Sequence, residues 1–128
     1  MKIAALIARI LLGLMFFVFG LNGFLHFIPI DKASMPTGLA GQYVGALMDS
    51  HYFYVVAGLQ TLGGLLLLVG FYVPLALTLL GPVIVNILCY HIFLDHKGLL
   101  MAIVVTVLWS IVALRYRENF AGLFAQKA

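Results

Sequence analysis

Residues 53–94 read FYVVAGLQTLGGLLLLVGFYVPLALTLLGPVIVNILCYHIFL, and this run contains no Asp, Glu, Lys or Arg. Its two apolar halves meet at Phe71-Tyr72-Val73-Pro74, an uncharged linker that ends in a residue favoured in the first turn of a helix. Each half is long enough to cross a hydrocarbon core of about 30 Å as a helix. Because the linker is so short, the sequence predicts two antiparallel membrane helices, residues 53–71 and 74–94.

Similar apolar runs lie on both sides of this hairpin. One covers residues 3–27, and the other covers residues 99–114, after the polar turn at residues 95–98. Of the 128 residues, 65% are hydrophobic and only 9% are charged, whereas a soluble domain carries about a quarter charged residues. We therefore expect one all-α membrane domain over residues 1–128, a four-helix bundle with the lipid bilayer as its solvent.

The distribution of lysine and arginine predicts the orientation of this bundle. With an even number of spans both termini lie on one side, and that side carries Lys2, Arg9, Arg115, Arg117 and Lys127. The opposite side carries only Lys32 and Lys97. Because cytoplasmic segments are richer in these residues, we expect a bacterial inner-membrane protein with both termini, and the tail of residues 115–128, in the cytoplasm. The net charge of +3 and the lack of a basic run give no indication of nucleic-acid binding.

The long loop between the first two spans predicts a shorter helix of its own. Pro36-Thr37 is a typical helix start with Thr37 as the cap, and apolar residues then recur at helical spacing over residues 37–49. This segment is too short to span the bilayer. We expect an interfacial or re-entrant helix over the outer mouth of the bundle, either as a simple cover or as a gate.

Polar side chains inside the spans are the candidate functional residues, because such groups are costly in hydrocarbon unless they face a partner. Counted from the outer helix ends at 1.5 Å per residue, each span has a polar residue roughly 10–13 Å deep, and two histidines lie about 4–6 Å deep. This layering predicts a polar ligand pocket in the outer half of the bundle. Its expected ligand-binding residues are Asn22, His26, Gln60, Asn86, Tyr90, His91, Thr106 and Trp109.

Two questions about this pocket stay open at the level of sequence. Asn86 and His91 lie about 140° apart around one helix, so they need not face the same cavity. The polar groups could also serve only as hydrogen bonds between helices, worth about 0.6–2 kcal/mol each. Small residues such as Gly63-Gly64 would then allow a neighbouring helix to approach closely.

The residue types also restrict the chemistry. The sequence contains no nucleotide-binding loop, nucleophile motif or paired carboxylate, and Cys89 is the single cysteine, inside a span. Two histidines could ligate a metal or a haem, but no cysteine, carboxylate partner or ligand spacing accompanies them. The sequence therefore disfavours a metal or a haem and leaves the cofactor undetermined, with a quinone as the candidate.

Residues 8–23, 60–70 and 82–91 resemble the first, second and third helices of the DoxX-like family of small four-helix membrane proteins. Some members are linked to thiosulfate oxidation with quinone as acceptor, or to membrane oxidoreductase assemblies that handle thiols, so the resemblance implies an oxidoreductase setting. The family's second helix usually has a glutamate where this chain has Gln60. This difference removes an ionisable group and keeps the capacity to hydrogen-bond a carbonyl.

We therefore expect a DoxX-like protein that binds a quinone-like or other small apolar ligand, as a component of an oxidoreductase system with a membrane or periplasmic redox partner. Gln60, Asn86 and His26 would hydrogen-bond the ligand, and Tyr90 and Trp109 would flank its ring. One alternative is a non-catalytic scaffold or subunit of a larger complex. A second is a small-molecule transporter, whose path through four helices is narrow unless a homodimer widens it.

Overall fold

The computed structural model describes residues 2–25 and 37–126. Within these ranges four long helices dominate: α1 (Lys2–Leu25), α3 (Tyr52–Val69), α4 (Val73–Phe93) and α5 (Leu99–Arg115), the last preceded by the short helix η2 (His96–Gly98). All four segments are long and apolar enough to cross a membrane. The predicted fold class, an all-α protein with four membrane-spanning helices, is confirmed.

The α3–α4 hairpin forms at the predicted uncharged linker. Gly70 ends α3 with a φ of 79°, a left-handed conformation that glycine adopts without steric cost. Its N–H donates to the Leu66 carbonyl at 2.9 Å, and Pro74 lies in the first turn of α4, where its missing N–H is not needed. The chain therefore reverses within a few residues, and α3 and α4 run antiparallel.

Glycines bring α1 and α3 close together. A Cβ atom at Gly64 of α3 would collide with the backbone nitrogen of Phe17 and lie 2.7 Å from the Gly13 carbonyl oxygen. A Cβ atom at Gly20 would similarly lie 2.9 Å from the Ala57 carbonyl oxygen. The expectation that Gly63-Gly64 lets a helix approach closely is confirmed for Gly64, since its partners are backbone atoms of α1.

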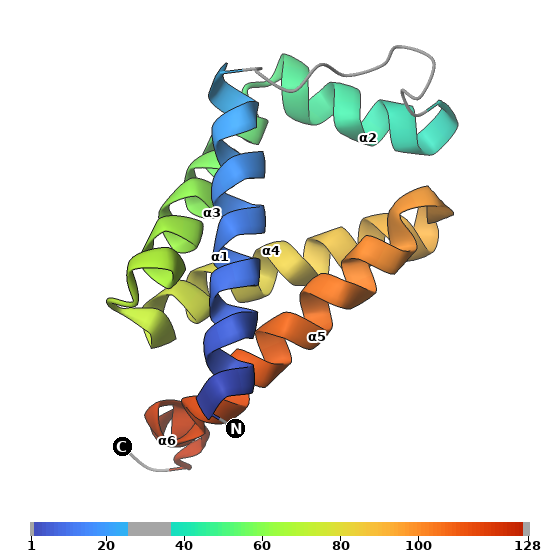
Figure 1. Cartoon of the computed structure of the whole chain (residues 1–128). Coiled ribbons are helices and arrows are strands. Elements are labelled where there is room, and N and C mark those ends of the chain that lie inside the picture. Colours follow the sequence, from blue (N-terminus) through green and yellow to red (C-terminus); the bar gives the residue numbers. More distant parts are fainter. Residues whose placement is uncertain (1, 26–36, 127–128) are drawn as a thin grey trace.

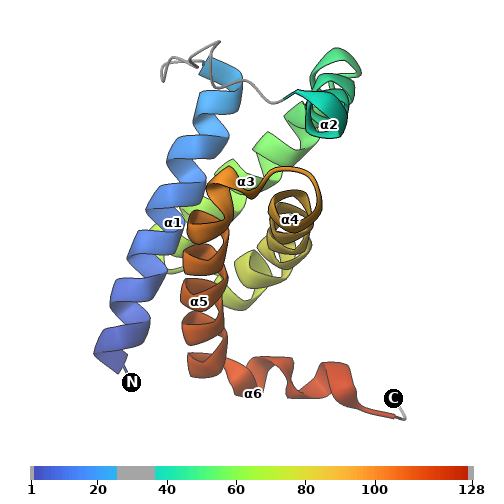
Figure 2. The same ribbon diagram turned by 90° about the vertical axis from the view of Figure 1, so that its right-hand side faces the viewer.

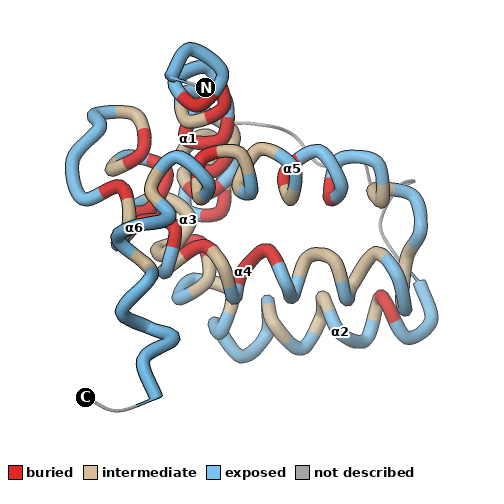
Figure 3. Tube along the Cα trace, turned by 90° about the horizontal axis from the view of Figure 1, so that it is seen from below, coloured by how far each residue is buried: buried red, intermediate tan, exposed pale blue. Residues whose placement is uncertain are grey.

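The tightly packed core lies toward the end of the bundle that carries both termini. In Figure 1, α1 and α3 diverge from the α4–α5 pair toward the other end, and Figure 3 shows the buried residues gathered where these four helices approach one another. Large apolar side chains on the outward faces stay exposed, as expected where lipid replaces water. The largest fully buried side chains are Leu12, Leu67, Leu77, Leu80 and Val112.

The predicted short helix is α2 (Gly38–Asp49), which lies across the bundle end opposite the termini (Figure 1). Thr37 occupies the N-cap position, but its side chain makes no capping hydrogen bond. The helix packs on α3, and the ring of Tyr43 lies 5.6 Å from that of Tyr90 on α4. At the other end, α6 (Arg117–Phe120) and η3 (Ala121–Phe124) turn sharply away from α5 (Figure 2).

Candidate functional site

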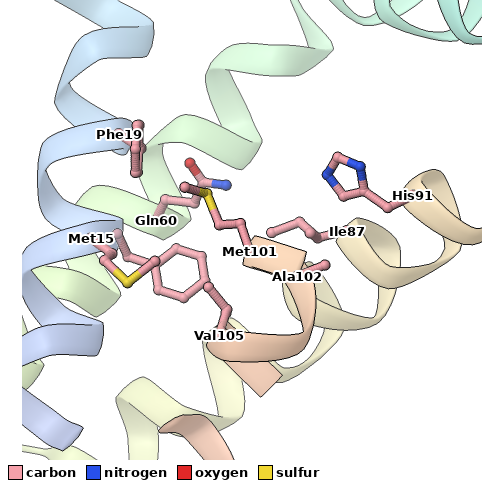
Figure 4. Close-up of a pocket in the computed structure, with 9 residues that line it drawn as sticks. Met15, Phe19, Gln60, Ile87, His91, Met101, Ala102 and Val105 are labelled. Carbon is pink, nitrogen blue, oxygen red and sulfur yellow. The ribbon is translucent and has the colours of Figure 1, made fainter. Parts of the chain in front are cut away.

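A cavity of about 220 Å³ lies between α1, α3, α4 and α5, on the α2 side of the packed core. It forms where the two helix pairs diverge, so side chains of all four helices contribute to its wall (Figure 4). The wall is mainly apolar, with one amide and one imidazole. The lining residues are Met15, Phe16, Phe19, Gln60, Ile87, His91, Met101, Ala102 and Val105.

Gln60 contributes the amide to this wall. It lies eight residues after the start of α3, about 12 Å along the helix axis at 1.5 Å per residue. The side chain is half-buried and reaches the cavity. No residue in the described part of the chain forms a hydrogen bond with this amide. A polar group in this position costs free energy unless a ligand or water satisfies it.

His91 contributes the imidazole from the last turn of α4. Its Nδ1 lies 3.0 Å from the backbone oxygen of Asp95, and a carbonyl can only accept, so Nδ1 must donate. In the neutral ring Nε2 is then a hydrogen-bond acceptor. The ring also packs on Gly98, because a Cβ atom there would collide with it. The Asp95 carbonyl and the Gly98 backbone therefore fix the orientation of the ring, and the Asp95 carbonyl favours the tautomer with its proton on Nδ1.

Apolar side chains of α1 and α5 complete the wall, and these were not identified from the sequence. Met15 and Phe19 lie four residues apart and share a face of α1, with Phe16 beside them. This four-residue spacing indicates a shared helix face. It does not identify a ligand site, because an apolar face of a membrane span can contact either lipid or protein. Phe19 and Met101 are 45% and 52% exposed, so the cavity opens between α1 and α5.

Two of the predicted ligand residues on α4 face elsewhere. Asn86 is exposed and does not line the cavity, and Thr78 and Pro82, at four-residue steps from it, are exposed as well. Asn86 and His91 therefore do not share a cavity. Tyr90 packs its ring against Tyr43 of α2 and lies 5.0 Å from the His91 ring, nearly perpendicular to it. Tyr90 thus adjoins the site and connects it to α2.

The remaining predicted residues make contacts within the bundle or lie outside the described ranges. Thr106 donates to the Ala102 carbonyl of its own helix at 2.8 Å. Trp109 donates its indole N–H to the Leu77 carbonyl of α4 at 3.0 Å. Asn22 is half-buried on α1 and does not line the cavity, whereas His26 lies outside the described residues. The structure brings Gln60 and His91, from the predicted set, to one cavity.

The sequence matches the model of a known protein family. The sequence model of the DoxX family matches residues 4–92. The chain belongs to the DoxX family. The DoxX match runs from α1 through nearly all of α4 and includes Gln60 and His91, whereas the lining residues of α5 lie beyond it. No curated protein and no solved structure matches the chain.

Proposed function

We propose that this DoxX protein binds a small apolar ring compound with polar edges, of the quinone type, in the cavity between its four long helices. The bound compound would serve a membrane oxidoreductase system. The observation that carries this proposal is the Gln60 amide, which faces an apolar cavity and has no hydrogen-bond partner among the described residues. A ligand carbonyl would accept from that amide and remove the cost of leaving it unsatisfied.

The two polar groups of the cavity suit different ligand atoms. The Gln60 amide can donate to a carbonyl oxygen, whereas Nε2 of a neutral His91 accepts from a hydroxyl. A quinone carries carbonyl oxygens, and its reduced form carries hydroxyls on the same carbon atoms. The cavity therefore offers a donor and an acceptor that match the two redox forms of such a ring.

The size and opening of the cavity also fit this class of ligand. An apolar protein cavity of about 150 Å³ is known to hold a benzene molecule, so about 220 Å³ accommodates one substituted ring. Phe16 and Phe19 supply aromatic surfaces, and Met15 and Met101 supply polarisable thioethers that adapt to a ring. An apolar tail attached to the bound ring would extend through the opening between α1 and α5 into the surrounding lipid.

Fluorescence of the single tryptophan, Trp109, provides a binding assay. Purified protein in detergent is titrated with a short-chain quinone, and we expect saturable quenching. Each of Gln60→Leu and His91→Phe should weaken binding about 2- to 12-fold, because one hydrogen bond is worth roughly 0.5–1.5 kcal/mol.

Asn86→Leu is the matched control, because it removes an amide at similar depth that faces away from the cavity. Its binding should equal that of the unmodified protein. Quenching that does not saturate, or an equal loss in the Asn86 variant, would exclude the cavity as the binding site.

A second candidate function, a scaffold or subunit of a larger complex, is favoured by the position of Asn86. Its exposed amide lies in the interior of a membrane-spanning helix, where an amide is costly against lipid and favours hydrogen bonding to another helix. Crosslinking in native membranes distinguishes this role. A stable partner that is lost in Asn86→Leu but kept in Gln60→Leu would support the scaffold.

A further inference from the structure

A second hollow, of about 370 Å³, lies at the opposite end of the bundle, beside the chain termini. Its polar wall consists of Lys2 and Arg9 from α1 and of Arg115 and Tyr116 from the end of α5, and Gly70 closes it on the side of α3. We call these five residues the cationic groove. Three positive side chains from two different helices thus converge on one space.

Arg9 reaches the groove from inside the membrane-spanning part of α1. It lies seven residues after Lys2, about 10 Å along the helix axis, yet its guanidinium contacts Gly70 at the end of α3. A Cβ atom at Gly70 would collide with Nη1 of Arg9, so the absence of a side chain at position 70 makes room for the charge. The charge of Arg9 therefore lies at the end of α3, as is typical of a long basic side chain that extends from an apolar span toward the interface.

Arg115 and Tyr116 form the opposite side of the groove. The guanidinium carbon of Arg115 lies 5.9 Å from the centre of the Tyr116 ring, within cation–π range. The Tyr116 ring itself packs against the buried core. The core therefore positions Tyr116, and Tyr116 in turn restrains Arg115 beside Lys2.

The described residues that line the groove carry an excess of positive charge. None of its lining residues in the described part of the chain is acidic. Like charges around one space repel, and an anion placed between them removes this repulsion and adds charge-assisted hydrogen bonds. Arginine and tyrosine side chains both donate, and phosphate oxygens are strong acceptors for them.

We propose that the cationic groove binds the phosphate group of an anionic phospholipid. Lys2 and Arg115 mark the ends of two membrane-spanning segments, so the groove lies at the level where lipid headgroups meet the protein. Ala5 and Leu6 continue the wall along α1 and offer apolar surface for the part of an acyl chain that adjoins the headgroup. This site is separate from the cavity around Gln60 and does not depend on the function proposed for that cavity.

Native mass spectrometry of the protein in detergent, with added phosphatidylglycerol or phosphatidylcholine, tests this proposal. Phosphatidylglycerol should bind in preference. Each of Arg9→Gln and Arg115→Gln should weaken its binding about fivefold, and the double variant roughly thirtyfold, because a basic residue near an anionic headgroup contributes about 1 kcal/mol.

Arg117→Gln is the matched control. Arg117 lies at the same end of the bundle, donates to the Leu114 carbonyl and does not line the groove, so its removal should leave lipid binding unchanged. Equal losses in the Arg117 variant, or equal binding of the two lipids, would overturn the proposal. Displacement of phosphatidylglycerol by millimolar inorganic phosphate would also overturn it, since the site would then take a soluble anion. If Arg9→Gln does not fold, Arg115→Gln alone decides the outcome, because Arg115 is exposed.

Discussion

Gly64 allows α1 and α3 to approach closely, because backbone atoms of Phe17 and Gly13 occupy the space that a side chain at this position would need. Backbone cannot move aside without separating the helices. Gly64→Ala should therefore destabilise the protein by about 1–3 kcal/mol, the usual cost of overpacking, measured as a lower midpoint of thermal unfolding in detergent. Gly58→Ala is the control on the same helix, where the nearest atom to an added Cβ is 3.9 Å away. A comparable loss in both variants would mean that the close α1–α3 contact is not what limits stability.

Trp109 is the second residue whose role the structure specifies. Its indole N–H donates to Leu77 on α4, so we expect it to join α4 to α5 and not to flank a ligand ring. Trp109→Phe keeps an aromatic ring and removes the donor, and it should cost about 0.6–1.7 kcal/mol of stability, typical of polar contacts in membranes. Ser110→Ala serves as the comparison, because its hydroxyl donates to the Thr106 carbonyl within its own helix. Unchanged unfolding of the Trp109 variant would contradict this role.

At the scale of elements, α2 is held mainly by α3 and by the contact of Tyr43 with Tyr90. An aromatic pair contributes about 0.5–1.5 kcal/mol beyond burial. Tyr43→Ala should therefore raise amide hydrogen exchange in residues 38–49 about 2- to 12-fold without affecting α1. Leu39→Ala, at a position that is 69% exposed, should leave exchange unchanged. If both variants exchange at the rate of the unmodified protein, α2 is held by other contacts.

For the whole molecule, the arginine and lysine distribution predicts that both termini are cytoplasmic. The structure places both termini at one end of the bundle (Figures 1 and 2) and the η2 turn at the other. In a Cys89→Ser background, Lys97→Cys should react with an impermeant maleimide added outside intact cells. Gly122→Cys should react only after the membrane is opened. The reverse labelling pattern would show that the bundle is inserted the other way round.

The molecule as a whole has a tightly packed half and an open half. Leu12, Leu77 and Val112 fill the space between helices near the termini, and the cavity forms beyond them, where the helix pairs diverge. The proposed ligand site and the proposed lipid site thus lie on opposite sides of one core. A substitution that loosens this core is expected to affect both sites, whereas changes at Gln60 or Arg115 should affect one.

The membrane spans, the α3–α4 hairpin and the short helix α2 followed from the sequence alone. Apolar length, the uncharged linker before Pro74 and helical spacing are local properties, and transfer into lipid sums over consecutive residues. Helix bounds such as Val73–Phe93 and Leu99–Arg115 accordingly agree with the predicted spans to within a residue.

The grouping of side chains depended on the tertiary structure. Depth along a helix can be counted from the sequence, and it placed Gln60 and Asn86 at one level. Which face of a helix meets its neighbours depends on how all four helices cross, so only the structure separated His91 at the cavity from Asn86 at the surface. The same holds for Arg9 and Arg115, which are far apart in the sequence. They line one groove because the first turns of α1 lie beside the end of α5.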